Sequence, residues 1–220
     1  MFYFDSINGQ KVVKSDLLKG IEHCFTTRGI DINQIFPNNY VPISPRQTHS
    51  NNVEITDKRI EYPNTDGLII TEKNIPIALK FADCTPIIFY DNQNRIGAVT
   101  HAGWRGTAQK IGQKTIEKMR INFGTKPEDI TALIGPAIGL CCYEVSDDVR
   151  KKLLETVTNK SGLTKGNNID LKQINKRQLE EIGVYKIDIC PYCTSCNNDL
   201  FYSYRKECGT TNRHYAMLML

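Results

Sequence analysis

Cys84 and His101 stand at the margins of two apolar segments, and His49 lies in a short polar stretch upstream. Thiols and imidazoles serve as nucleophiles, as bases and as zinc ligands in proteins. Cys84 follows Asp83 and directly precedes the apolar run "PIIF", so a strand would hold it at the edge of a sheet, where active sites commonly lie. These three residues are therefore the first candidates for a chemical site.

Three interpretations of this set are open on the residue types alone. Cys84 could attack a substrate while a histidine takes its proton and Asp83 or an amide orients the ring. Cys84 and the two histidines could instead bind Zn²⁺, or copper, and leave one position open for water or substrate. The third interpretation is a buried cysteine with two ordinary histidines. The spacings match no local signature such as HExxH, so they do not choose among the three.

The segment "HAGWRGT" follows His101 and adds a candidate anion contact. Gly103 and Gly106 would let the backbone approach a ligand closely, and the planar guanidinium of Arg105 suits phosphate or carboxylate. Thr107 is predicted to cap the following helix, whose N-terminus would favour an anion. The alternative is a tight strand-to-helix turn with a surface arginine.

The cysteines allow a second site. "CPYCTSC" carries Cys190, Cys193 and Cys196, which could form a metal-binding knuckle, a redox pair or incidental thiols. A metal there would need a fourth ligand, for which Cys208 and His214 are available. Cys141 and Cys142 lie in "GPAIGLCCYEV", where glycine and proline indicate close packing, and are predicted to be structural.

Periodicity predicts the elements that would position these residues. Strict alternation in "IPIALKF" predicts a strand, and the turn "NQN" joins the next two apolar runs into a hairpin. Helical spacing follows the hairpin and ends at Gly124, and Asp170 and Gly183 bound a later helix. The predicted strands are 75–81, 85–91, 95–101, 129–135, 184–189 and 213–220; the later helices are 144–157 and 171–182. Strands mixed with a few helices favour an α+β fold.

Composition narrows the class of protein. The 220 residues are long enough for a real core and are expected to form a single domain over 1–220. A net charge of +4, without a dense basic run, argues against nucleic acid as a partner. No signal peptide and no membrane-length apolar run is present, so a cytoplasmic protein with no membrane association is expected. GxGxxG, Walker A and GxSxG motifs are absent.

Five segments together resemble the bacterial laccase-domain family, whose members carry the names polyphenol oxidase, peptidoglycan editing factor and purine nucleoside phosphorylase. The segments are "QTHSNNV", "TDGLIITEKNIPIALKFADCTPIIFYD", "IGAVTHAGWRGT", "IGPAIGLCCYEV" and "DLFYSYRKECGTTNRHYAMLML". The resemblance implies a four-layer α/β/β/α sandwich with mixed sheets. It also implies that His49, Cys84 and His101 are zinc ligands and form the catalytic centre, which replaces the nucleophilic interpretation of Cys84.

The same resemblance implies an activity. This is zinc-dependent phosphorolysis of adenosine, inosine, guanosine and methylthioadenosine to the base and ribose 1-phosphate, with adenosine deaminase activity. Purine nucleosides and phosphate are the expected partners of a monomer or homodimer, and Arg28 and Arg105 are the expected anion contacts. Alternatives are hydrolytic editing of peptidoglycan precursors and, less favoured, copper-dependent polyphenol oxidation. The sequence departs from the family pattern in three places. These are a short region after "HCFTTRG", the segment "RKECGTTNRHYAMLML" with Cys208 and His214, and the cysteine-rich "CPYCTSC".

Overall fold

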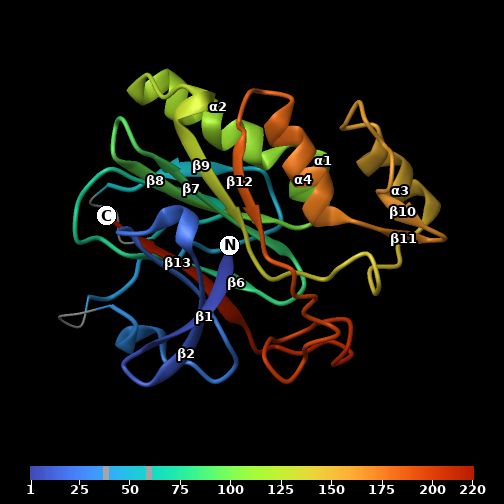
Figure 1. Cartoon of the computed structure of the whole chain (residues 1–220), viewed down its shortest axis with the longest axis horizontal. Coiled ribbons are helices and arrows are strands. Elements are labelled where there is room, and N and C mark those ends of the chain that lie inside the picture. The colour runs from blue at the N-terminus through green and yellow to red at the C-terminus, as the bar shows by residue number, and fades with distance from the viewer. Residues whose placement is uncertain (37–39, 58–60) are drawn as a thin grey trace.

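Two stacked β-sheets form the centre of the molecule (Figure 1). The computed structural model describes residues 1–36, 40–57 and 61–220. The first sheet is antiparallel, in the order β1 (Phe2–Ile7), β2 (Gln10–Ser15), β3 (Glu22–Thr26), β13 (His214–Met219) and β6 (Ile77–Phe81). The second sheet is mixed, in the order β12 (Lys186–Ile189), β9 (Ile130–Ile134), β7 (Thr85–Asp91), β8 (Ile96–Ala102), β5 (Gly67–Ile70) and β4 (Val53–Ile55).

The helices lie on the far side of the second sheet. The described residues form α1 (Trp104–Ala108), α2 (Ile111–Phe123), α3 (Asp147–Leu154) and α4 (Leu171–Glu180). Figure 1 shows α2 and α4 above the second sheet, with α3 beside the short ribbon of β10 (Thr164–Lys165) and β11 (Asn168–Ile169). No helix within the described ranges has both the length and the apolar character needed to cross a bilayer.

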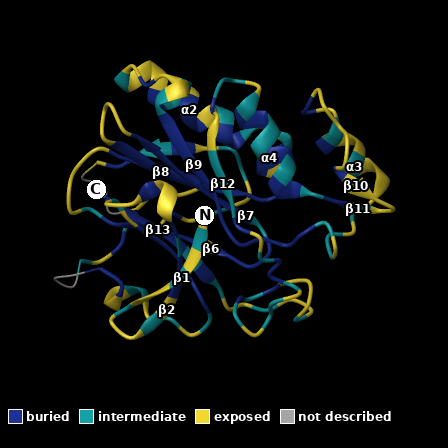
Figure 2. Cartoon of the chain, viewed as in Figure 1, coloured by how far each residue is buried: buried dark blue, intermediate teal, exposed yellow. Residues whose placement is uncertain are grey.

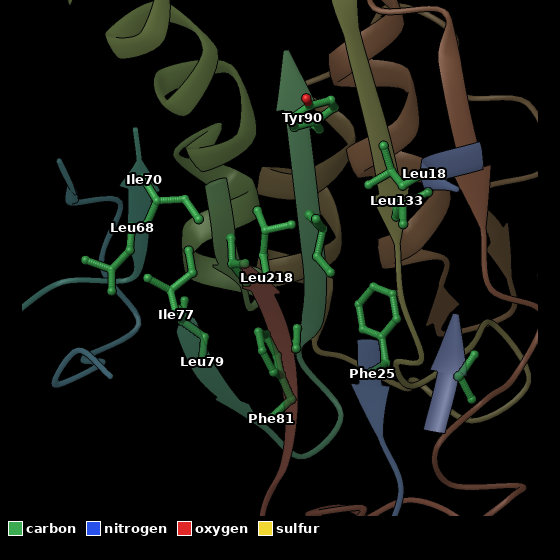
Figure 3. Packing of buried hydrophobic residues seen from close by; sticks show 14 of the residues in the cluster. Leu18, Phe25, Leu68, Ile70, Ile77, Leu79, Phe81, Tyr90, Leu133 and Leu218 are labelled. Carbon is green, nitrogen blue, oxygen red and sulfur yellow. The ribbon is translucent and has the colours of Figure 1, made fainter. Parts of the chain in front are cut away.

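The inner faces of the two sheets enclose the main core. Phe25, Leu79 and Leu218 of the first sheet pack against Leu68 and Leu133 of the second (Figure 3). All five side chains are fully buried. Figure 2 shows the inner strands of the sheets largely buried, whereas the edge strands β1 and β12 are not. The sheets therefore share one hydrophobic core.

β7 shows why a continuous apolar run belongs at the centre of a sheet. Successive side chains of a strand point to opposite faces. Ile88 and Tyr90 accordingly pack in the core between the sheets, whereas Ile87 and Phe89 pack against the helices. Because both faces of the second sheet are covered, the sequence of β7 does not alternate between apolar and polar residues.

The outer face of the first sheet has a thinner cover. Ile35 and Phe36, with the 3₁₀ turn Ile32–Gln34, pack against Val12 and Met217 there. The expected α+β sandwich is confirmed. Within the described residues, however, a 3₁₀ turn and the residues after it take the place of the expected α-helical layer on this side. The short region after Arg28 thus contributes to this layer.

Most predicted elements are confirmed, with differences at their ends. The hairpin pairs β7 with β8, Asp170 caps α4, and Gly124 ends α2 in the left-handed conformation. The first predicted helix is divided, because Lys110 adopts a φ of 57° and separates α1 from α2. Thr107 is not a cap, since it lies inside α1, where Gly103 is the N-cap.

His214 gives the folded state a pH dependence. Its side chain is fully buried on β13 between Phe81 and Phe201, and burial lowers its pKa to about 3. The unfolded chain therefore binds this proton near pH 6.5 and the folded chain does not, so stability falls as the pH falls below that value. Between about pH 7 and pH 5 this histidine should account for a loss of roughly 2 kcal/mol. Urea unfolding of His214→Leu at both pH values, with chelator present, should show a correspondingly smaller loss than the parent; an equal loss would contradict this assignment.

Candidate metal centre and cavity

His49, Cys84 and His101 come together from three places in the chain. Cys84 directly precedes β7, His101 lies in β8, and His49 lies in the loop before β4. The hairpin register pairs Thr85 with Ala102, which brings Cys84 to the end of β8. The ligand atoms of the three residues all lie within 4.8 Å of one another. The fold thus brings the three predicted residues together, whereas their role as metal ligands stays a prediction.

Gly103 is required for this close approach. A Cβ atom at this position would lie 3.0 Å from the Sγ atom of Cys84 and 3.3 Å from Cδ2 of His49. Both contacts are tighter than ordinary van der Waals distances, so any larger residue would displace the thiol or the imidazole. Gly103 thus leaves room for the thiol of Cys84 and the imidazole of His49 to lie side by side.

Asp66, directly before β5, orders two members of the cluster. Its carboxylate is fully buried and accepts the Nδ1–H of His101 at 2.8 Å, so Nε2 is left for a ligand. It also accepts the backbone N–H groups of Thr48, His49 and Ser50, and the Ser50 hydroxyl. Asp66 was not selected from the sequence. An aspartate directly before the apolar run "GLII" is nevertheless a signal, because a carboxylate buried there needs hydrogen-bond donors.

The charges in the cluster depend on one another. Burial alone would raise the pKa of Asp66, but hydrogen bonds from His101 and Ser50 lower it to about 2. Burial would also raise the pKa of Cys84, and the neighbouring His101 and His49 lower it to about 6. Burial alone would lower the pKa of His101, but the neighbouring Cys84 and Asp66 outweigh it and raise the pKa to about 9. The metal-free cluster at neutral pH is therefore a thiolate beside an imidazolium.

Asp83 ties Cys84 to the C-terminal part of the chain. Asp83 has a φ of 77°, and His49 a φ of 61°, which is the left-handed region that few residues other than glycine adopt. The carboxylate of Asp83 accepts the hydroxyl of Thr194 at 2.6 Å and the backbone N–H of Arg205 at 2.7 Å. These bonds hold the unusual backbone conformation next to the thiol in place.

A cavity of about 850 Å³ opens onto the cluster. Trp104, Ile138 and Tyr143 give it apolar and aromatic walls, and all three members of the cluster are among its lining residues. Four cationic side chains also line it: Lys80, Arg46, Arg205 and Arg213. The volume is that of a small-molecule site, and the cations make it suited to an anionic substrate.

The two arginines predicted from the sequence lie elsewhere. Arg28 pairs with Glu207 at 2.9 Å and lies over the ring of Tyr202, and Arg105 is exposed beside Trp104. Neither is among the residues lining the cavity, so their role as substrate contacts stays a prediction. Nothing in the local sequence marks Arg46, Arg205 or Arg213 as cavity residues, because only the fold brings their loops to the cavity.

The stacked sheets and the convergent cysteine and histidines define a sandwich domain with a candidate metal centre in the lining of a cavity. The chain belongs to the multi-copper polyphenol oxidoreductase laccase family, whose model matches residues 22–220. This confirms the family expected from the sequence.

Named relatives agree on the family and differ in activity. The chain is 35% identical over 190 residues to purine nucleoside phosphorylase YlmD of Bacillus subtilis. The alignment covers 78% of this chain and 68% of the relative. It is 30% identical over 224 residues to adenosine deaminase RL5 from an unknown prokaryotic organism, covering 92% and 82%. The crystal structure of YlmD from Geobacillus stearothermophilus superposes with a TM-score of 0.86 at 28% identity and 98% coverage of both chains.

Proposed function

We propose that the chain is a zinc-dependent purine nucleoside phosphorylase that also deaminates adenosine. The observation that carries the proposal is the convergence of His49, Cys84 and His101 in the lining of a cavity that also carries three arginines and a lysine. The names of two relatives, a purine nucleoside phosphorylase and an adenosine deaminase, support the same choice of substrates.

The donor set fits zinc. One thiolate and two imidazoles are three protein ligands, which is the number found in catalytic zinc sites. The hydrogen bond from His101 to Asp66 is the outer contact that such sites use to fix a histidine ligand. A bound zinc ion would supply a Lewis acid that polarises a substrate oxygen or lowers the pKa of a water molecule.

The residues of the chain itself account for substrate binding in this proposal. The aromatic rings of Trp104 and Tyr143 offer faces on which a purine can stack. Arg46, Arg205 and Arg213 line the cavity and offer guanidinium groups, which are able to bind phosphate in bidentate fashion. Phosphate held there would be positioned for attack on the ribose carbon that carries the base.

Phenol oxidation by a multicopper centre is less favoured. The chain has four histidines in all. Two of them, His23 and His214, are buried in β3 and β13 of the first sheet. One cysteine and two histidines leave too few ligands for several copper ions.

The proposal is tested by incubating zinc-loaded protein with adenosine in the presence and absence of phosphate. We expect adenine and ribose 1-phosphate to form only when phosphate is present, and inosine to form without it. Inosine, guanosine and methylthioadenosine should be cleaved in the same way. Absence of both base and inosine, with zinc bound at full occupancy, would rule the proposal out.

Arg46→Gln tests which cations hold the phosphate. Loss of a charge-assisted contact of about 1.5 kcal/mol should raise the KM for phosphate roughly tenfold, while KM for adenosine changes little. Arg105→Gln is assayed alongside: the family resemblance predicts a similar rise, whereas its position outside the cavity lining predicts almost none. Equal phosphate kinetics for Arg46→Gln and the parent would show that the anion binds elsewhere.

A further inference from the structure

A second group of thiols lies apart from the metal centre just described. The four-cysteine cluster consists of Cys141, Cys142, Cys193 and Cys196. Their Sγ atoms all lie within 4.8 Å of one another, and all four cysteines are free thiols. The sequence predicts a structural role for Cys141 and Cys142 and offers Cys208 or His214 as a further ligand; the structure instead places Cys141 and Cys142 beside Cys193 and Cys196.

The topology of the second sheet explains why these cysteines meet. β9 and β12 are parallel neighbours, so the loops that follow them leave the same edge of the sheet. An isolated parallel bridge between Ala137 and Cys193 extends that pairing beyond the strands. The loop after β9 therefore brings Cys141 and Cys142 against the loop after β12.

The remaining candidate ligands lie elsewhere. Cys190 is fully buried in the core between the sheets, and His214 is fully buried on β13. Neither Cys208 nor His214 belongs to the group whose ligand atoms converge. The cluster therefore takes two ligands from each of two loops, and the pair Cys193–Cys196 has the two-residue spacing common in zinc sites.

The spacing of the sulfur atoms suits a metal ion. The Sγ atom of Cys196 lies 3.4 Å from that of Cys141 and 3.4 Å from that of Cys142. A disulfide would need about 2.05 Å. Four sulfurs at about 2.3 Å from a tetrahedral zinc ion lie roughly 3.8 Å from one another, which is within the range of this cluster.

The surrounding backbone is arranged for negatively charged sulfur. The N–H of Gly139 donates to the Sγ atom of Cys193 at 3.2 Å. A Cβ at Gly139 would lie 3.3 Å from Cβ of Cys193 and 3.4 Å from Sγ of Cys141, so a larger residue would crowd the ligands. The carbonyl of Gly139 accepts the N–H groups of Cys142 and Tyr143, which closes the turn that presents the first two thiols.

We propose that the four-cysteine cluster binds one zinc ion, or a divalent ion of similar softness, as a structural site distinct from the centre at Cys84. Four protein ligands leave no open position, which is typical of structural rather than catalytic zinc. The ion would join the loops after β9 and β12. Ile138 and Tyr143, on either side of the first cysteine pair, line the cavity, and Thr194 within the second pair bonds Asp83. The site would thereby fix one wall of the cavity.

Metal stoichiometry tests this proposal without reference to activity. Full-length protein, purified under reducing conditions, is analysed by native mass spectrometry and elemental analysis. We expect two zinc ions per chain in the parent, one in Cys84→Ala and one in the double variant Cys141→Ser with Cys196→Ser. Cys208→Ser, a change of an exposed cysteine outside both groups, is the matched control and should retain two.

Cobalt makes the test independent of variants that fail to fold. In Cys84→Ala the four-cysteine cluster is intact, so Co²⁺ should give the visible bands of tetrahedral coordination and strong thiolate-to-cobalt charge transfer. A Cys84→Ala protein with reduced thiols that binds neither zinc nor cobalt would overturn the proposal. So would a disulfide between Cys196 and either Cys141 or Cys142 in parent protein isolated without oxidant, detected as a mass lower by two hydrogens.

Discussion

Cys84→Ala is expected to lower kcat/KM for adenosine phosphorolysis on the order of 10³-fold, together with loss of zinc from the centre. The thiolate is the one anionic ligand among the three, and alanine leaves two imidazoles that hold zinc weakly. Burial raises the pKa of Cys84, but His101 and His49 outweigh it and favour the thiolate. Among the described residues that line the cavity, no second cysteine is available to replace it. Steady-state kinetics and metal analysis of the same preparation measure both effects.

A second substitution separates a ligand from a nucleophile. Cys84→Asp keeps an anionic ligand of similar size beside Gly103, so a metal ligand role predicts retained zinc and partial activity. A nucleophilic role predicts zinc retention with no activity. Cys208→Ser controls for the loss of a thiol and should behave like the parent, while a Cys84→Ala enzyme with parental zinc content and rate would contradict the assignment of the centre.

Asp66→Asn should weaken zinc binding at the centre by about 10–100-fold and destabilise the fold by roughly 2–4 kcal/mol. The buried carboxylate accepts hydrogen bonds from the backbone of the His49 loop and from the His101 ring at once. An amide keeps one acceptor oxygen and turns an NH₂ group toward N–H donors, which leaves buried donors unpaired. Competition with a chromogenic chelator measures the zinc affinity, and urea unfolding of the metal-free protein measures the stability.

Ser50→Ala is the matched control for Asp66. It removes one hydroxyl donor to the same carboxylate and leaves the charge and the bond to His101 in place. We expect a loss of about 1 kcal/mol in stability and little change in zinc affinity. Parental zinc affinity in Asp66→Asn would show that the carboxylate orders the loop without supporting the metal ligands.

The sandwich itself could largely be predicted, because its signals are local. β6 alternates between its two faces, β7 and β8 are continuous apolar runs, and a polar turn joins them. Each of these patterns reflects how one segment is buried, so it can be recognised without the rest of the chain. The hairpin even placed Cys84 and His101 at the same end of two paired strands. The sequence predictions include no strand before residue 75. β1 and β2 form a local hairpin whose turn at Asn8 and Gly9 was overlooked. β3 and β5, in contrast, also pair with the later strands β13 and β8, which no local pattern reveals.

The sequence by itself determined the candidate residues of the centre: His49, Cys84 and His101 stand out by type, and the surrounding motifs identify the family. The tertiary structure alone decided what surrounds them, namely the buried carboxylate of Asp66 and the arginines of the cavity. It also decided that Cys193 and Cys196 face Cys141 and Cys142 rather than Cys208 or His214. The physical reason is that the chemistry of a side chain is known from the sequence alone. The distance between two loops, in contrast, depends on the parallel pairing of β9 and β12, which are separated by more than fifty residues of chain.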